Sequence, residues 1–142
     1  MRRWTLCVLA AGALAACGKG GGDKPPAAEA PPAPAAAPSA LAALEAEVLV
    51  PKCAAGGGCH SGASPAGGLD LSAGSSHKNL AGVKALRRPE RLRVAAGDPA
   101  GSYLVQRLSE GGDSPRMPLG GEPLPAADVE RLKAWIADGA KP

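Results

Sequence analysis

Residues 51–62 read PKCAAGGGCHSG and place two cysteines and a histidine within one short segment. Cys59 and His60 are adjacent, and five residues separate Cys59 from Cys53. Three of those five residues are glycines, which adopt tight backbone conformations at little steric cost. The segment therefore holds two thiols and an imidazole, which are strong nucleophiles and metal ligands, close together in the chain.

A Cys-x-x-Cys-His sequence is the attachment signature of a c-type haem. The two thiols add across the vinyl groups of the porphyrin, and the adjacent histidine binds the iron. Here the ending Cys59-His60 matches, while the glycines lengthen the spacing to Cys53 and are able to loop out. We therefore predict one covalent haem c, with Cys53 and Cys59 forming its thioethers and His60 as the proximal iron ligand.

A second iron ligand is predicted further along the chain, where residues 116–120 read RMPLG. Met117 is the only methionine apart from Met1, and a Pro- and Gly-rich loop is an unusual place for a methionine that merely fills a core. A thioether sulfur is a soft ligand, and methionine with histidine is a common axial pair of a covalently bound haem. We predict Met117 as the distal ligand, with His77 in reserve.

The composition also favours a prosthetic group. The 142 residues include 20 Gly and 15 Pro but no Phe, so few large side chains are available to build a core. Long Gly- and Pro-rich loops inside a domain usually serve a function. A large prosthetic group supplies apolar area on which short helices pack and around which such loops wrap.

Three helices are predicted, and no convincing strand. Ser39 caps a helix over Ala40–Val50, which Pro51 ends. Asp98, followed by proline, starts a second helix, and apolar residues at helical spacing indicate a third over Ala126–Asp138. The predicted fold class is all-α, with few short helices and long loops.

The motifs of residues 41–142, taken in order, resemble those of the small single-haem bacterial cytochromes c. The matching residues are Cys53, Cys59 and His60, then the segments 67–71, 94–104, 116–118 and 128–140. The resemblance implies a small cytochrome c-like fold in which the first and last helices cross, with Trp135 near the crossing. It also implies an electron carrier that serves redox partner proteins, and not an enzyme.

The N-terminus predicts export and lipidation. Arg2 and Arg3 precede an apolar run too short to span a bilayer, and this run ends in Leu-Ala-Ala before Cys17, which resembles a lipoprotein lipobox. Residues 1–16 are therefore predicted as a signal peptide, and residues 17–40 as the lipidated Cys17 with a disordered Gly/Pro/Ala linker. Residues 41–142 are predicted to form the cytochrome c-like domain. We expect it on the periplasmic side of a bacterial membrane, held only by its lipid, and Gly18 favours the outer membrane.

Two other interpretations of the cysteines stay open. In the first, Cys53 and Cys59 form a disulfide in a haem-free structural or interaction module. In the second, the two cysteines bind zinc together with His60 and His77.

The charged residues argue against nucleic acid as a partner, and they include one basic cluster with several possible roles. The net charge of +3 is near neutral once Arg2 and Arg3 are removed, which argues against nucleic-acid binding. A basic cluster surrounds Pro89, formed by Arg87, Arg88, Arg91 and Arg93. It is either a solvated face, a docking patch for an acidic redox partner, or a partner of the haem propionates.

Overall fold

The structure, a computed structural model, describes residues 37–55, 59–109 and 114–142. The predicted signal peptide, Cys17 and nearly all of the predicted linker lie outside these residues. The three glycines between the two cysteines, Gly56–Gly58, also lie outside them. All described residues belong to one unit of the chain, Ala35–Pro142.

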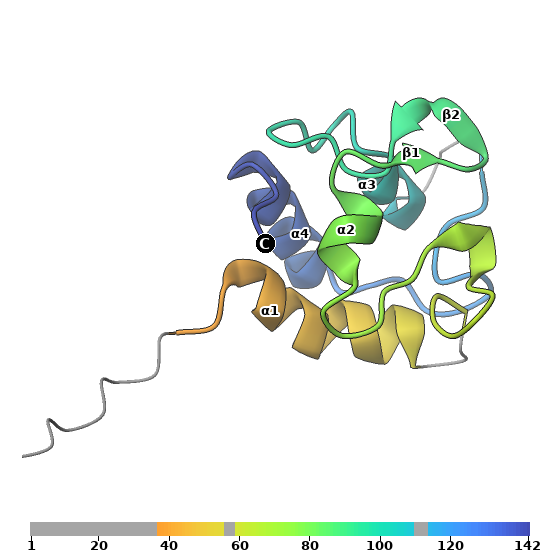
Figure 1. Cartoon of the computed structure of the whole chain (residues 1–142), viewed down its shortest axis with the longest axis horizontal. Coiled ribbons are helices and arrows are strands. Elements are labelled where there is room, and N and C mark those ends of the chain that lie inside the picture. Colours follow the sequence, from red (N-terminus) through yellow and green to blue (C-terminus); the bar gives the residue numbers. More distant parts are fainter. Residues whose placement is uncertain (1–36, 56–58, 110–113) are drawn as a thin grey trace, which may run out of the picture. The chain divides into compact units, whose positions relative to one another are not determined.

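The first helix begins where the sequence predicts and runs further. Helix α1 (Ala40–Leu44) is capped by the Ser39 hydroxyl, which accepts a hydrogen bond of 3.2 Å from the Ala42 N–H. It continues directly as the π-helical segment η1 (Glu45–Ala54), so Pro51 lies inside the helix and does not end it (Figure 1). A proline ring clashes with the carbonyl four residues earlier in an α-helix. The π-helical pattern pairs each N–H with the carbonyl five residues earlier, and the helix passes Pro51 in this wider form.

The expectation of an all-α fold is wrong. Strands β1 (Lys84–Ala85) and β2 (Arg88–Leu92) form a two-stranded antiparallel sheet, so the fold is mixed (Figure 1). The strands gave no sequence signal because β2 reads RPERL, without alternating apolar residues, and the Leu86-Arg87 link lacks the Gly or Asn typical of tight hairpins. Pro89 and the charged side chains suit an edge strand.

The remaining helices agree only partly with the predictions. Helix α4 (Ala126–Ala137) confirms the third predicted helix. Helix α3 (Tyr103–Leu108) begins later than predicted, because the carboxylate of Asp98 accepts from the Gly101 N–H and closes a turn before the helix. Helix α2 (Ser76–Leu80) is not among the helices that the sequence predicts.

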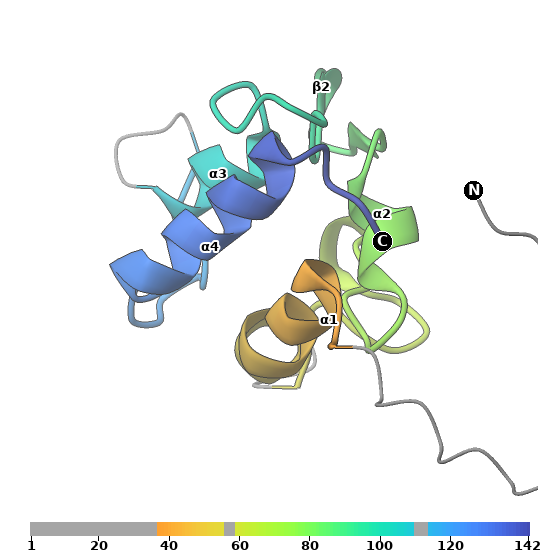
Figure 2. The same ribbon diagram turned by 90° about the vertical axis from the view of Figure 1, so that its left-hand side faces the viewer.

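The core lies between these helices. Helix α4 contacts both α1 and α3 (Figure 2). Trp135 of α4 is buried in the same apolar cluster as Leu41 and Leu44 of α1, and its indole N–H donates to the Lys141 carbonyl at 2.7 Å. None of the helices in the described part of the chain is long and apolar enough to cross a membrane. Residues far apart in sequence thus enclose one core, and the site lies on one side of it.

Candidate functional site

A cavity of about 540 Å³ lies beside this core. Its volume is within the range of small-molecule and cofactor sites, roughly 300–1,000 Å³. Most of its lining is apolar and includes Leu69, Leu71, Leu80, Leu104 and Leu108. A lining of this kind suits an apolar ligand.

The four predicted haem residues all line this cavity. Cys53 comes from the last turn of η1, and Cys59 and His60 follow shortly after it. Met117 comes from the loop before α4, which is distant in sequence. The His60 N–H donates to the Cys53 carbonyl at 3.2 Å, which closes the loop between the two cysteines at its base. The fold thus brings two thiols, an imidazole and a thioether to one cavity.

The imidazole of His60 is held by the backbone. Its Nδ1 lies 3.1 Å from the Ala66 carbonyl oxygen, an atom that only accepts, so Nδ1 carries the proton. The lone pair is then on Nε2, the nitrogen that remains for a metal. The Ala66 N–H in turn donates to the Cys59 carbonyl at 2.7 Å, so the acceptor is tied to the cysteine segment. A ring N–H donated to a backbone carbonyl is the usual arrangement of a metal-binding histidine.

The loop that carries Met117 is also held by hydrogen bonds. The Met117 N–H donates to the Arg107 carbonyl at the end of α3, at 2.7 Å. Arg116 spans the loop and donates to the Gly121 carbonyl at 2.9 Å, while the Gly121 N–H donates to the Pro118 carbonyl at 3.2 Å. Met117 is partly buried and packs against the core. These contacts hold the thioether at the cavity.

The two thiols differ in environment. Cys53 is half-buried and packs against the core, and this burial raises the pKa of its thiol, although the Lys52 charge opposes the shift. Cys59 is exposed. The two sulfurs are not joined as a disulfide in the structure.

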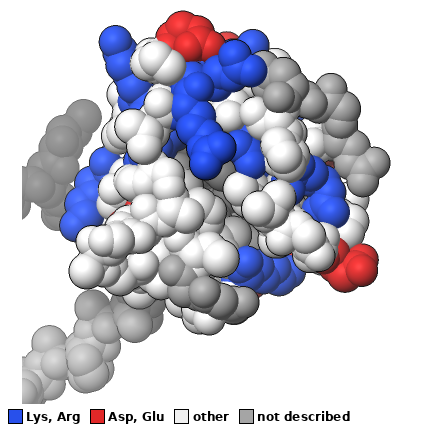
Figure 3. Space-filling view, turned by 90° about the vertical axis from the view of Figure 1, so that its right-hand side faces the viewer, with Lys and Arg blue, Asp and Glu red and all other residues white. Residues whose placement is uncertain are grey.

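The charged residues of the cavity lining are all basic: Lys52, Arg87, Arg93 and Arg107. No Asp or Glu is among the described residues that line it. Lys52 forms an ion pair of 2.5 Å with Asp128, and the Arg107 guanidinium lies 5.7 Å from the centre of the Tyr103 ring. Lys and Arg side chains also outnumber acidic ones on the face shown in Figure 3. The lining therefore suits a ligand that carries carboxylates on an apolar body.

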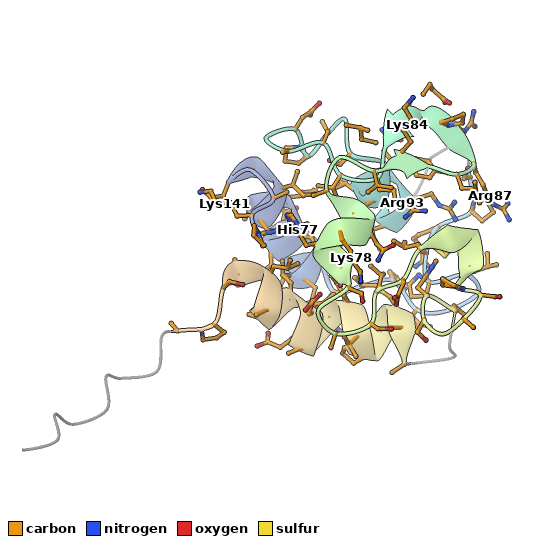
Figure 4. The ribbon with its side chains drawn as sticks, in the orientation of Figure 1. His77, Lys78, Lys84, Arg87, Arg93 and Lys141 are labelled. Carbon is orange, nitrogen blue, oxygen red and sulfur yellow. The ribbon has the colours of Figure 1, made fainter. Side chains whose placement is uncertain are left out.

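His77 lies away from this cavity. It sits in α2, where it is half-buried, and its Nε2 is 3.0 Å from the Ala140 carbonyl (Figure 4). It does not line the cavity with Cys53, Cys59 and His60. Over residues 37–55, 59–109 and 114–142, no three His, Cys, Asp or Glu side chains come together as a metal site.

Sequence reasoning missed part of the site. The sequence predicts a helix after Asp98 but gives no sign that Tyr103, Arg107 and Leu108 line a cavity, which they do. The helical spacing of Tyr103 and Leu108 marks an apolar face but does not say what covers that face. Comparisons of the chain with protein families, with curated proteins and with solved structures found no match.

Proposed function

We propose that this chain is a c-type electron carrier that holds one haem c in the cavity. Cys53 and Cys59 would form the thioethers, His60 would bind the iron on the proximal side and Met117 on the distal side. One observation carries the proposal: these four side chains, from two segments distant in sequence, line the same cavity.

The other lining residues suit the same ligand. Haem is a flat apolar ring with two carboxylates, and the lining combines leucines with basic side chains and no described acid. When bound, the iron supplies a centre that gains and loses one electron. The chain's own part is to present Nε2 of His60 and the sulfur of Met117, and to exclude water with Leu80, Leu104 and Leu108. The exclusion of water lowers the dielectric constant around the iron, which is one of the ways in which a protein sets the reduction potential of a haem.

We further propose that the chain is exported and exchanges electrons with redox partner proteins, without being an enzyme. Its predicted position is the periplasmic side of a bacterial membrane, held through a lipid on Cys17. The motivation is the sequence of residues 1–17, where a basic start, a short apolar run and small residues precede the cysteine.

The test is covalent haem retention. The full chain is expressed with a cytochrome c maturation system, purified, denatured and extracted with acidified organic solvent. We expect the haem to stay with the polypeptide and the intact mass to contain one haem. The variant His60→Ala is expected to keep the thioethers but to lose the low-spin spectrum, because an axial ligand is removed.

A colourless, folded protein would contradict the proposal. If its Cys53 and Cys59 were also joined as a disulfide, the haem-free module would be the better interpretation. Haem that is bound but fully extracted by the acidified solvent would contradict the thioether bonds but not the binding of haem in the cavity.

A further inference from the structure

Arg93 connects several segments around the cavity. Its backbone N–H donates to the Val83 carbonyl at 2.7 Å, and its carbonyl accepts from the Leu104 N–H of α3 at 2.9 Å. The main chain of Arg93 is therefore held on both sides, and its side chain extends from a fixed point toward the cavity lining (Figure 4).

The guanidinium of Arg93 binds three backbone carbonyls. Nη1 donates to the Asn79 carbonyl at 2.9 Å, and Nη2 donates to the carbonyls of Gly67 and Gly68 at 2.8 Å and 3.1 Å. Asn79 lies in α2, whereas the glycines belong to the short 3₁₀ turn η2 (Ala66–Gly68). The planar fork of arginine suits such multiple acceptors, and the single ammonium of lysine does not reach them together.

Apart from Arg93, the turn η2 is held by backbone hydrogen bonds, among them those from the Ala66 N–H to the Cys59 carbonyl at 2.7 Å and from the Gly68 N–H to the Pro65 carbonyl at 2.9 Å. None of its three residues is buried, so no side chain anchors it in the core. Gly67 and Gly68 have φ of +65° and +60°, a backbone conformation that glycine adopts freely. Because glycine has many other accessible conformations, these residues by themselves do little to hold the turn in this one. The first residue of this turn, Ala66, supplies the carbonyl that accepts from Nδ1 of His60.

We propose that Arg93 is a positioning residue for the iron-binding imidazole. It holds the Gly67 and Gly68 carbonyls and thereby keeps the Ala66 carbonyl against Nδ1 of His60. This inference rests on the proposed function for its electrochemical consequence, but the hydrogen bond that it concerns belongs to the chain itself.

The positive charge of Arg93 and its positioning of His60 shift the reduction potential of the haem in opposite directions. An experiment can therefore separate the two effects. Burial lowers the pKa of Arg93, yet an arginine stays protonated, so it brings a positive charge to the cavity. A positive charge near the iron favours the reduced form and raises the reduction potential. A strong hydrogen bond from Nδ1 makes the imidazole more electron-donating, favours the oxidised form and lowers the potential.

The experiment compares Arg93→Lys with Arg93→Gln in the full-length holoprotein. Arg93→Lys keeps the positive charge but loses the hydrogen bonds to the Gly67 and Gly68 carbonyls, so we expect the reduction potential to rise. We also expect the His60 Nδ1 proton to exchange with solvent about fivefold to tenfold faster in nitrogen-15 NMR, because its hydrogen bond weakens. Arg93→Gln is expected to show the same faster exchange, with a smaller rise in potential because the charge is lost as well.

Arg131→Gln is the matched control. Arg131 is a partly exposed arginine of α4 that pairs with Glu47 at 2.7 Å and with Asp128 at 3.6 Å, and it does not itself line the cavity. It is expected to leave both the exchange rate and the potential unchanged. Gly67→Ala is a second variant, which strains the turn at its positive φ while Arg93 stays intact. Gly67→Ala is expected to speed the exchange of the His60 Nδ1 proton as Arg93→Lys does. It can replace the Arg93 variants in the test if they do not fold.

Two results would overturn the inference. If Arg93→Lys leaves the exchange rate and the potential unchanged, Arg93 does not position His60. If Arg93→Gln only lowers the potential, with unchanged exchange, Arg93 acts through its charge alone. A wild-type protein without haem would contradict the proposed function instead, and the exchange of the His60 proton in that folded protein would still decide the role of Arg93.

Discussion

The carbonyl oxygen of Ala66 lies 3.1 Å from Nδ1 of His60. Since a carbonyl has no proton to give, this contact determines which ring nitrogen is protonated and leaves Nε2 as the metal-binding nitrogen. Two thiols and the Met117 sulfur line the same cavity as this ring. The arrangement leads to predictions that separate the roles of these residues.

Met117→Ala removes the proposed distal ligand. We expect haem to stay attached, because the thioethers do not involve Met117, and the potential to fall on the order of 0.1 V, a fraction of the ~0.8 V that axial ligands span. The weak iron–sulfur charge-transfer band of the ferric spectrum should disappear. Leu119→Ala is the control: Leu119 is in the same loop, also lines the cavity and is 71% exposed, but it carries no sulfur, so this variant should leave the band in place. An unchanged ferric spectrum in Met117→Ala would show that another ligand binds the iron.

Single cysteine variants count the thioether bonds. Because both Cys53 and Cys59 line the cavity, we predict two bonds, so each single variant should still retain haem after acidic extraction through the remaining sulfur. Intact mass and the haemochrome band, which shifts when one vinyl group is left unreacted, are the measurements. If Cys59→Ala loses all haem while Cys53→Ala is indistinguishable from the wild type, there is one bond, through Cys59.

Cys17→Ser tests the lipid anchor, which lies outside the described residues. The wild-type chain is expected in the membrane fraction with an acyl mass on Cys17, and the variant in the soluble periplasmic fraction. Haem content should be the same in both proteins, because the anchor and the cavity are separate parts of the chain. The anchor does not exist if the wild-type protein is already soluble and carries no acyl group.

Glu45→Gln should reduce stability in a pH-dependent way. The Glu45 carboxylate accepts from the N–H groups of Gly74 and Ser76 at 3.0 Å and 3.1 Å. Burial by itself raises the pKa of Glu45, but these hydrogen bonds outweigh it and leave the pKa below its ordinary value. A lowered pKa stabilises the folded state above the unfolded pKa of about 4.3, and this contribution is lost as the pH falls through the folded value.

We therefore expect Glu45→Gln to cost about 1 kcal/mol at neutral pH, because a charge-assisted hydrogen bond is lost, and to cost much less near pH 3. Denaturant unfolding of the holoprotein at both pH values measures this. Glu130→Gln is the control, since the Glu130 side chain is 68% exposed and forms an ion pair of 2.8 Å with Lys133. An equal loss at both pH values would mean that the charge of Glu45 plays no part.

The helix ends show where sequence reasoning succeeds. The hydroxyl of Ser39 and the apolar spacing of 126–138 predicted the start of α1 and the extent of α4, because capping and helical periodicity act between residues a few positions apart. The same reasoning placed the end of the first helix at Pro51, yet the chain continues as η1 to Ala54. Val48, Leu49 and Ala54 are buried on this segment, and their packing outweighs the local effect of the proline.

The hairpin shows the opposite case. Residues 84–92 carry no alternating strand pattern, although the residues that pair, Lys84 with Leu92 and Ala85 with Arg88, are close in sequence. A contact outside the hairpin also involves β2, since the Arg91 guanidinium donates to the Gln106 side chain of α3, and local propensity carries no information on such a contact.

For the site, the sequence by itself determined the kinds of atoms: two thiols, an imidazole and one thioether, in Cys53, Cys59, His60 and Met117. Their chemistry is a property of each side chain and needs no fold. Only the tertiary structure decided that Arg93 and Arg107 share the cavity, that His77 does not, and that the Ala66 carbonyl accepts a hydrogen bond from Nδ1 of His60. Arg93, Arg107 and the cysteine segment are far apart in the chain, so their distances are set by packing. The contact between His60 and Ala66 joins residues six positions apart and depends on the conformation of the loop between them.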